Sequence, residues 1–583
     1  MSEESLGLFK GQDKPDHIIA YQFYEDGIAY NQRINLPETV KNNENFFIGK
    51  QWEGVESNGL PTPQVNFLKR VTQYVVAVIT SDNIKVNATL MANLPGKSNL
   101  KLITQVVNRE FDAIFERNKT PWMVKEYARN AAVDGDGCIY AYFDPKAETG
   151  QEAKGQIKHE IIENTRVFFG NQADRAVQDQ PYIIIAQRKP VRVVKLEAKK
   201  NGVKDWDLIA DDEEEDNHVD AVKWTNGNTT LLTIFWKDDE TGHVWAYKYT
   251  RQCSVKEPWD TELTLYPIVW LNWDYVQDSY HGFGMITPLI PNQVFINKSY
   301  AMSMLTMMKE AGGKVIFDKT RIRQWDNRVG GAIGVAGDPT TAVKMVESPR
   351  MNPQVAEYIQ LTTEETEKSQ GATAVAMGDS RPDNTSAIVA LTRAAQTPHD
   401  ITKHNIYNSI EDLSRIDLEM MSVYYGKRYV DRPITKEERL IAEVGQQADP
   451  SIEIPNEVPE LFDFSILKDH PFMVKLDVGA SSYYSEMAAT KTLENLLMNQ
   501  FITPIQFLER ISDDNMPERL ALIEEMKNAQ SQAAAQEANM TAPLPNGEGT
   551  LINDGSKMDI TGGAGYAGLQ RAINNEGMTS QIL

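Results

Sequence analysis

The sequence predicts an α+β protein, because the spacing of its apolar residues changes twice along the chain. Up to about residue 135 the apolar side chains recur at helical intervals, and between residues 138 and 273 they alternate with a period of two, as in strands. From residue 288 the helical spacing returns. The 583 residues are 41% hydrophobic and 24% charged, which is the composition of a folded chain with a sizeable core. Helices are therefore expected on both sides of a β-rich region.

The first part of the chain, residues 1 to about 100, looks helical and polar. One amphipathic helix begins near Asn66, a second covers about Lys101–Arg117 and a third about Pro121–Val133, because apolar residues recur on one face of each. The stretch Asp134–Gly137 ends the third helix, since two glycines in four residues favour a turn.

The β-rich region is predicted from short runs of β-branched and aromatic residues between turn signals. The predicted strands are Cys138–Phe143, His159–Ile162, Tyr182–Ala186, Leu231–Trp236, His243–Tyr249 and Pro267–Trp273. Two of them form a hairpin around Asp238–Gly242.

The chain is strongly acidic, with 59 Lys and Arg against 82 Asp and Glu and a formal net charge of −23. A general nucleic-acid coat is excluded, because that role requires neutralisation of phosphates, although a few basic points could contact DNA. The acidic run Asp211–Asp216 could hold a metal or a basic partner, but a solvated loop is favoured because like charges repel. Two cysteines, Cys138 and Cys253, exclude a disulfide framework and a cysteine-based zinc site.

Long helices are expected again from residue 288. One covers Pro288–Ala311 and ends at Gly312–Gly313, a β-like insert covers Lys314–Val346, and a second helix covers about Pro353–Thr373. Methionines in the first of these helices, at positions 302, 304, 307 and 308, are interpreted as inter-helix packing, which flexible thioether side chains tolerate well.

A polar turn, Gly378–Ser386, leads into a third long helix that is expected to reach Tyr425 and end at Gly426. Pro398 lies inside this helix and is expected to kink it, because proline removes a backbone hydrogen bond. A mixed segment over residues 427–480 follows.

The two ends of the chain look different from its body. A helical block is expected over Glu486–Asn528, and the composition after residue 530, with few bulky apolar residues, predicts a mobile tail. The first residues, Met1–Ser5, lack the features of a signal peptide, and no apolar run approaches the ~20 residues that cross a bilayer. We therefore expect that the protein has no membrane partner and is made in the reducing interior of a cell.

The sequence shows no recognisable catalytic, cofactor or metal motif. No phosphate-binding loop of the Walker type is present, and Gly282–Gly284 is interpreted as a turn because Thr287 stands where a dinucleotide loop needs glycine. His399 and His404 are five residues apart, about 140° round a helix, so they are interpreted as surface or core residues. The prediction is a protein that is not an enzyme.

The order of elements, together with several local stretches, resembles the portal (head-to-tail connector) proteins of tailed bacteriophages. The stretches are Asn45–Trp52 with Pro63–Asn66, Ala131–Gly137, Tyr280–Gly284 with Leu289–Asn297, and Ala374–Asp379 through Asn384–Ser386. The resemblance covers about residues 40 to 525.

The resemblance implies a portal-like architecture, in which the family's region names fall on successive parts of this chain. The implied regions are a wing (1–285 and, with the long kinked helix, 387–480), a stem (286–311 and 352–375), a clip (312–351), a tunnel loop (376–386), a crown (481–529) and a flexible tail (530–583).

The resemblance also implies a function and partners. The family forms a ring, usually of twelve subunits, at one capsid vertex, and double-stranded DNA passes through its channel during packaging and ejection. The implied partners are the terminase large subunit, a head–tail adaptor, and the major capsid and scaffold proteins, with assembly in the host cytoplasm. The candidate channel residues are Arg381, Asp379, Asp383, Asn384, Lys298, Lys309 and Lys368.

Two alternatives from other classes stay open at this point. One is a metal-dependent nuclease or another enzyme with an unrecognised site, which converging carboxylates would favour. The other is a capsid or scaffold-like shell protein, which would build a closed lattice rather than discrete rings.

Overall fold

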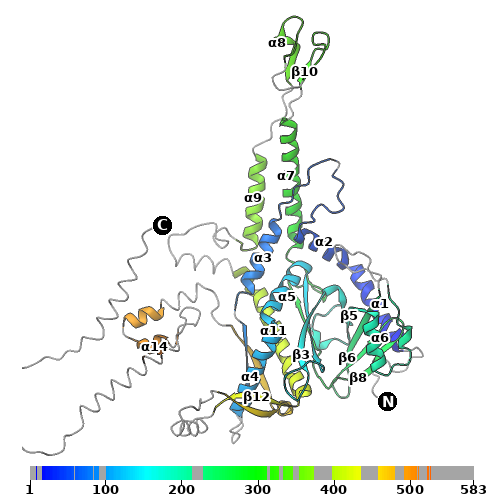
Figure 1. Ribbon diagram of the computed structural model, residues 1–583, viewed down its shortest axis with the longest axis vertical. Helices are drawn as coiled ribbons and strands as arrows, with labels where there is room; N and C mark the ends of the chain where they lie inside the picture. Colours follow the sequence, from blue (N-terminus) through cyan, green and yellow to red (C-terminus); the bar gives the residue numbers. More distant parts are fainter. Residues whose placement is uncertain are drawn as a thin grey trace, which may run out of the picture. The chain divides into compact units, whose positions relative to one another are not determined.

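A computed structural model of the chain (Figure 1) divides into two compact units, Met1–Glu486 and Met487–Leu583. The structure mixes helices with antiparallel sheets, which confirms the predicted α+β class. The residues that the structure describes are 8, 16–57, 59–82, 84–90, 100–212, 227–311, 315–326, 332–345, 354–372, 397–434, 457–478, 492–499, 501–508, 510, 522–523 and 526.

Five helices form most of the first part of the chain, as the apolar spacing predicts. They are α1 (Asp16–Arg33), α2 (Leu36–Ile48), α3 (Phe67–Ile79), α4 (Leu100–Arg117) and α5 (Thr120–Asp134). The start of α3 is fixed by Asn66, whose side-chain oxygen accepts a hydrogen bond from the Lys69 backbone N–H at 3.1 Å. Gly49 ends α2 at a φ of 100°, a conformation that glycine adopts without strain.

Two antiparallel sheets form the β-rich region. The three-stranded sheet has the order β3-β2-β9, and the five-stranded sheet has the order β4-β5-β6-β7-β8. The strands are β2 (Asp136–Asp144), β3 (Gln156–Ile162), β4 (Val167–Phe169), β5 (Ile183–Pro190), β6 (Asn228–Lys237), β7 (Val244–Tyr249), β8 (Ser254–Asp260) and β9 (Ile268–Asn272). All six predicted strands are present, and the β6–β7 hairpin turns where the sequence predicts it.

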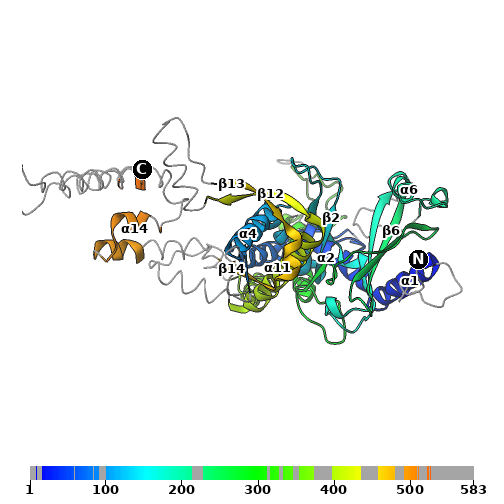
Figure 2. The same cartoon turned by 90° about the horizontal axis from the view of Figure 1, so that it is seen from below.

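The five-stranded sheet is covered on both faces. Helix α1 packs Ile19 and Tyr24 against one face, while the three-stranded sheet packs Cys138 and Ile268 against the other. Helix α6 (Val191–Lys200) flanks this sheet (Figure 2) and buries Val194 and Ala198 in a smaller apolar cluster.

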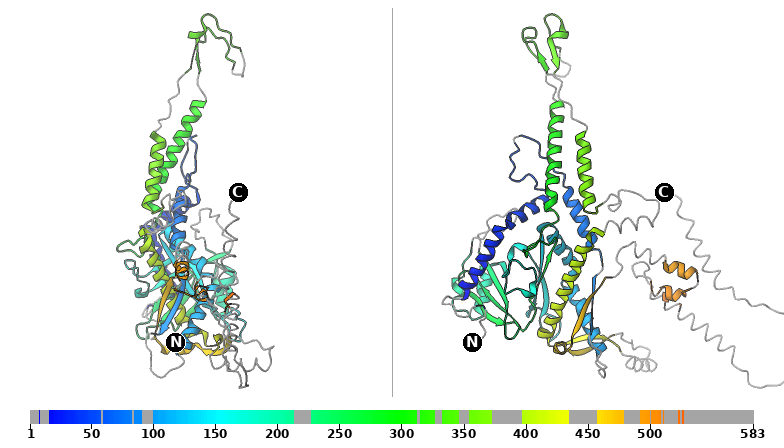
Figure 3. Two further views of the ribbon diagram at one scale, coloured as in Figure 1. Left: turned by 90° about the vertical axis from the view of Figure 1, so that its left-hand side faces the viewer. Right: turned by 180° about the vertical axis from the view of Figure 1, so that it is seen from behind.

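Helices α7 (Ile290–Ala311) and α9 (Gln354–Ser369) run side by side in Figures 1 and 3. They are antiparallel, because Asn292 near the start of α7 donates to the hydroxyl of Thr366 near the end of α9 at 2.9 Å. The segment between them contains β10 (Val315–Phe317), α8 (Pro339–Ala342) and β11 (Val343–Met345), and β10 pairs with β11. The predicted helix, β-like insert and second helix are therefore all present.

Helix α11 (Asp400–Met420) lies in the third long helix predicted after the polar turn, and residues 387–396 of that prediction lie outside the described residues. Pro398 was expected inside a long helix, but it lies in a 3₁₀ turn, Thr397–His399, that precedes α11. A proline here loses no helical hydrogen bond, because the first turn of a helix has no partner for its N–H groups. A π turn, Met421–Tyr425, extends the helix to Gly426, which is where the sequence predicts its end.

The chain after α11 returns to the body of the first unit as strands. β12 (Lys427–Pro433) pairs with β13 (Glu457–Asp463), and β14 (Phe472–Val478) pairs with β1 (Ile84–Leu90). β1 lies in a region that the sequence predicts to be helical, so that prediction is wrong for residues 84–90. The strand is polar on one side, and only Val86 and Ala88 are buried.

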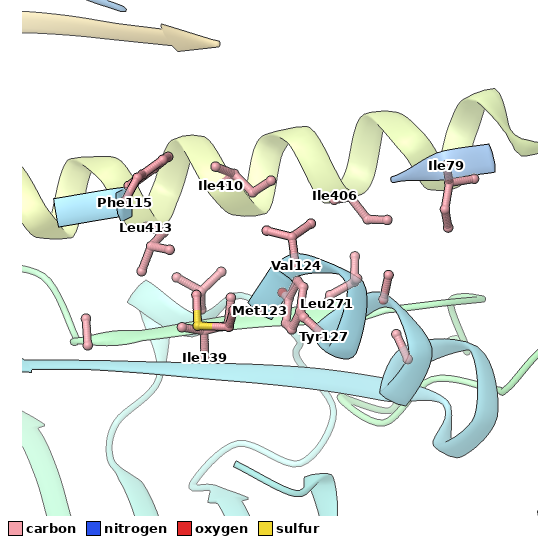
Figure 4. Packing of buried hydrophobic residues seen from close by; sticks show 14 of the residues in the cluster. Ile79, Phe115, Met123, Val124, Tyr127, Ile139, Leu271, Ile406, Ile410 and Leu413 are labelled. Atoms are coloured by element: carbon pink, nitrogen blue, oxygen red, sulfur yellow. The ribbon is translucent and has the colours of Figure 1, made fainter. Parts of the chain in front are cut away.

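The main core forms where α3, α4, α5 and α11 pack on the three-stranded sheet. In Figure 4, Ile406, Ile410 and Leu413 of α11 lie opposite Tyr127 of α5 and Ile139 of β2. These α11 residues recur at intervals of three and four, which places them on one face of the helix. The apolar stripe that the sequence shows in this segment therefore makes the core contact.

In the second unit the structure describes α14 (Pro504–Leu508), which lies inside the predicted helical block. The predicted tail after residue 530 falls outside the described residues. No helix in the described part of the chain is both long enough and apolar enough to span a bilayer. Both cysteines are buried free thiols.

Candidate functional site at the base of the α7–α9 pair

Three of the seven predicted channel residues lie on the α7–α9 pair. Lys298 and Lys309 are exposed and eleven residues apart in α7, so they lie within about 20° of each other round the helix. Lys368 is exposed near the end of α9 and forms an ion pair with Glu365 at 3.2 Å. The other four predicted residues, Asp379, Arg381, Asp383 and Asn384, lie outside the described residues.

The methionines of α7 do not pack within the chain. Met302, Met307 and Met308 are 57%, 57% and 65% exposed, and Met304 is exposed as well. These exposures are those of a single chain, and the predicted inter-helix packing of the methionines stays a prediction. Together with the exposed side chains of α9, these residues form what we term the stem face: Met302, Met304, Met307, Met308, Tyr358 and Leu361.

Met304 and Met307 lie on other sides of α7 than its two lysines, whereas Met302 lies beside the lysines. At 3.6 residues per turn, Met307 lies about 180° from Lys298 round the helix axis, and Met304 lies about 120° away. Met302 is four residues from Lys298 and seven from Lys309, about 40° and 20° round the helix, so it lies on the same side of α7 as the two lysines.

A buried amide network joins the start of α7 to the segment that follows α2. Asn297 donates from Nδ2 to Gln51 Oε1 at 2.7 Å and accepts at Oδ1 from Gln293 Nε2 at 2.9 Å. Gln293 also donates to the carbonyl of Val65 at 2.6 Å. Buried amides of this kind are costly when unpaired, so the network fixes where α7 leaves the body of the unit.

Asn43 ties three elements together at the same base. Its Nδ2 donates to the Val133 carbonyl of α5 and to the Thr287 hydroxyl, both at 2.8 Å. Thr287 opens the 3₁₀ turn Thr287–Leu289 that leads into α7. The end of α5 and the start of α7 are therefore held by one side chain of α2.

Asp136 and His281 form a buried pair beside this junction. The Nδ1 atom of His281 lies 2.7 Å from Asp136 Oδ2, and the backbone N–H of Gly282 donates to Asp136 Oδ1 at 2.6 Å. Asn272 Nδ2 also donates to Oδ1 at 2.8 Å, and His281 Nε2 lies 3.2 Å from Asn31 Oδ1. These hydrogen bonds to the Asp136 carboxylate hold the turn that contains His281 against the end of α5.

Glycines allow these two turns to meet. A Cβ added to Gly135 would lie 2.9 Å from the Gly282 carbonyl oxygen, and one added to Gly284 would lie 2.7 Å from the Val133 carbonyl oxygen. Both contacts are with backbone, which cannot move aside as the end of a side chain could. The backbones of the two turns therefore touch directly.

Further polar contacts connect the α7–α9 pair and α11 to their surroundings. Arg70 of α3 forms an ion pair with Glu367 of α9. His159 of β3 and Asp417 of α11 have fully buried side chains, with His159 Nε2 2.8 Å from Asp417 Oδ1. His399 is buried and bonds the Gln370 carbonyl at 2.8 Å, which agrees with its interpretation as a surface or core residue.

The junction brings together stretches that the sequence analysis identified separately. The network of Gln51 and Asn297 joins Asn45–Trp52 to Leu289–Asn297. The pair of Asp136 and His281 joins Ala131–Gly137 to Tyr280–Gly284. Sequence reasoning missed the pairing itself, and the glycines at the meeting turns were the only local signal of it.

The chemistry of the junction is structural. Its amides, glycines and one buried carboxylate–imidazole pair bind one another. Among the described residues no group of three or more His, Cys, Asp or Glu side chains could hold a metal ion.

Comparison with known proteins gives one family. A family model described as "Phage P22-like portal protein" matches residues 187–547, more than half of the chain. This span includes α7, α9 and α11. No curated protein matches the chain.

Proposed function

The chain belongs to the phage P22-like portal protein family, and from this premise we propose that it forms a ring, of twelve subunits, at one capsid vertex. As a phage portal protein it is a component of the virion. The family match over residues 187–547 is the observation that carries the proposal, because it covers the long helices, the insert between them and α11. The ring would serve as the conduit for double-stranded DNA during packaging and ejection.

The stem face supports the ring. Six large apolar side chains of α7 and α9 are exposed in the single chain, and such a concentration on two neighbouring helices is typical of a surface that another protein covers. Methionine side chains adapt to small changes in packing, which suits a contact repeated between neighbouring subunits. We assign the stem to residues 286–311 and 352–375 on these grounds.

The remaining regions are assigned by their place in the chain. The proposed regions are the wing at 1–285 and 387–480, the clip at 312–351, the tunnel loop at 376–386, the crown at 481–529 and the tail at 530–583.

The charge distribution suits a conduit. A ring of subunits that each carry a net charge of −23 repels the DNA backbone and lets the duplex slide without a preferred register. The basic stripe of Lys298 and Lys309 would supply sparse attractive points along the channel. Lys368 and the tunnel-loop residues Asp379, Arg381, Asp383 and Asn384 are proposed to face DNA as well.

In this proposal the protein is a structural conduit and does not hydrolyse ATP. The energy for packaging would come from a separate terminase that docks at the clip, and a head–tail adaptor would bind there after packaging. Major capsid and scaffold proteins would contact the wing during assembly in the host cytoplasm.

Negative-stain electron microscopy of the purified protein tests the proposal. We expect discrete rings with a central hole. Closed shells would instead indicate a capsid-like protein, and metal-dependent cleavage of DNA by ring-free protein would indicate a nuclease.

A further inference from the structure

A groove of about 650 Å³ lies away from the α7–α9 pair, between the two sheets of the first unit. Its walls come from β2, α6, β8 and the end of α11, and we term it the α6 groove. Its size is typical of sites that hold a small ligand or a few side chains of a peptide. Its lining includes Tyr140, Leu196, Lys200, Lys248, Lys256 and Trp259.

Aromatic side chains from both faces of β2 and from the end of α11 line the groove, and we term them its aromatic floor. Aliphatic side chains of α6 line it as well. Tyr140 stacks on Tyr142 with ring centroids 5.3 Å apart, and Phe143 stacks on Tyr424 at 5.1 Å. On the α6 side, Val193 and Leu196 are 49% and 50% exposed. Exposed aliphatic side chains beside an aromatic floor favour a bulky apolar group as ligand.

Four lysines and two carboxylates, Asp144 and Glu197, line the groove, so its lining carries a net positive charge although the chain is acidic. Lys146, Lys200, Lys248 and Lys256 line it, and Lys248 is paired with Glu197 at 2.8 Å. Within the described part of the chain, Lys200 and Lys256 form no salt bridge. The Lys256 ammonium instead lies 3.3 Å from the centroid of the Trp259 ring.

The surroundings of Lys256 leave its charge poorly compensated. Burial, with the neighbouring Lys248 ammonium, lowers the pKa of Lys256 to about 8, while Glu197 acts weakly in the opposite direction. A carboxylate brought into the groove would stabilise the charged amine by direct attraction in a partly desolvated place.

We propose that the α6 groove binds an acidic peptide segment of a partner protein, with a bulky apolar side chain on the aromatic floor and carboxylates at Lys200 and Lys256. The charge complementarity carries the choice of occupant. Nucleic acid fits less well, because the ring faces of Tyr140 and Phe143 are already stacked on neighbouring rings and are not free to stack on bases. This inference is independent of the ring and the channel.

Fluorescence anisotropy on the full chain tests the proposal. The probe is a short fluorescein-labelled peptide in which glutamates alternate with leucine and tryptophan. We expect saturable binding that Lys200→Glu with Lys256→Glu weakens at least about tenfold, because two attractions become repulsions. Leu196→Asp should weaken binding comparably, since it places a charge on the apolar flank.

Matched variants outside the groove provide the controls. Lys204→Glu and Leu208→Asp change exposed residues of the same types nearby, and binding should stay within about twofold of wild type. A peptide with lysine in place of glutamate should bind the Lys200→Glu, Lys256→Glu variant better than the wild type, which a merely misfolded variant would not do.

Three results would overturn the proposal. One is the absence of saturable binding, and another is binding that the groove variants and the control variants weaken equally. The third is a labelled single-stranded oligonucleotide that binds with the same dependence on Lys200 and Lys256, which would make the groove a phosphate site.

Discussion

Asp134 and Asp136 are two residues apart and have opposite surroundings. Asp136 accepts a hydrogen bond from the Gly282 backbone and lies beside His281. Asp134 has a buried Oδ1 atom, and burial, with the nearby Glu44 carboxylate, raises the pKa of Asp134 well above its usual value. The Asp136 carboxylate therefore has hydrogen-bond donors, whereas the charged form of Asp134 is destabilised.

We expect Asp134→Asn to stabilise the protein near neutral pH. A carboxyl whose pKa is raised by folding favours the folded state below the unfolded pKa, and this contribution is lost as pH rises through the folded pKa. Asparagine does not ionise, whereas the aspartate of the wild type must lose its proton in a buried place as pH rises. The gain in melting temperature over wild type should therefore grow from pH 4 toward pH 8. Thermal unfolding at several pH values measures this gain, and a difference independent of pH would contradict the explanation.

We expect Asp136→Ala to lower the free energy of unfolding by about 3–5 kcal/mol, because it leaves buried donors without their acceptor. Asp239→Ala, at an exposed position in the β6–β7 turn, is the control and should change it by less than about 0.5 kcal/mol. Denaturant unfolding followed by tryptophan fluorescence gives both values. A loss below about 1 kcal/mol for Asp136→Ala would show that the pair is not a significant constraint.

At the residue scale, the sequence predicted the turns at Asp134–Gly137 and Gly282–Gly284 but did not predict that they contact each other. The glycine-rich stretches around Asp136 and His281 could be predicted as turns from local composition alone. Their pairing joins residues 145 positions apart, and no local spacing specifies which of several turns will meet.

At the scale of elements, the bounds of the long periodic helices were predicted most closely, whereas the short helix α6 was missed. The period of 3.6 residues is a property of a single segment, so the bounds of α4, α5 and α7 agree with the prediction within about two residues. β1 was missed because it buries only Val86 and Ala88 and depends on a partner strand from the far end of the first unit.

The stem face gives a prediction about assembly. We expect Met304→Glu with Met307→Glu to abolish rings while leaving the fold of the subunit intact, because charges replace apolar side chains that are exposed in the single chain. Electron microscopy and light scattering measure assembly, and circular dichroism measures the fold. Ile401→Glu, a change at a 75% exposed apolar residue of α11, should leave rings intact.

The proposed tunnel loop gives a second prediction at this scale. Arg381 is the only cation of Gly378–Ser386, between Asp379 and Asp383. An exposed ion pair contributes only about 0–1 kcal/mol, so Arg381→Ala should barely change thermal stability. If the loop contacts DNA, the variant should alter packaging or DNA retention in assembled particles. Normal packaging and retention would remove Arg381 from the mechanism.

At the scale of the whole molecule, we expect the tail to be dispensable for ring formation. The composition after residue 530 offers little apolar surface to offset the entropy of ordering. A chain truncated at Gln530 should therefore form rings as the full chain does, by electron microscopy. A truncated protein that stayed monomeric would show that the tail has a structural role.

The pairing of β1 with β14 has a consequence for synthesis. Thr89 and Met473, which are bonded across this pair, are 384 residues apart in the chain. A ribosome adds about 5–20 residues per second, so β1 waits roughly 20–80 s for its partner. During that time its hydrogen-bonding edge is open to other chains, a hazard that Asn108 reduces on one side by bonding the Ala88 backbone N–H at 2.6 Å. Incomplete nascent chains lack β14, so only the completed subunit can pair β1 and reach the fold that assembles into the virion.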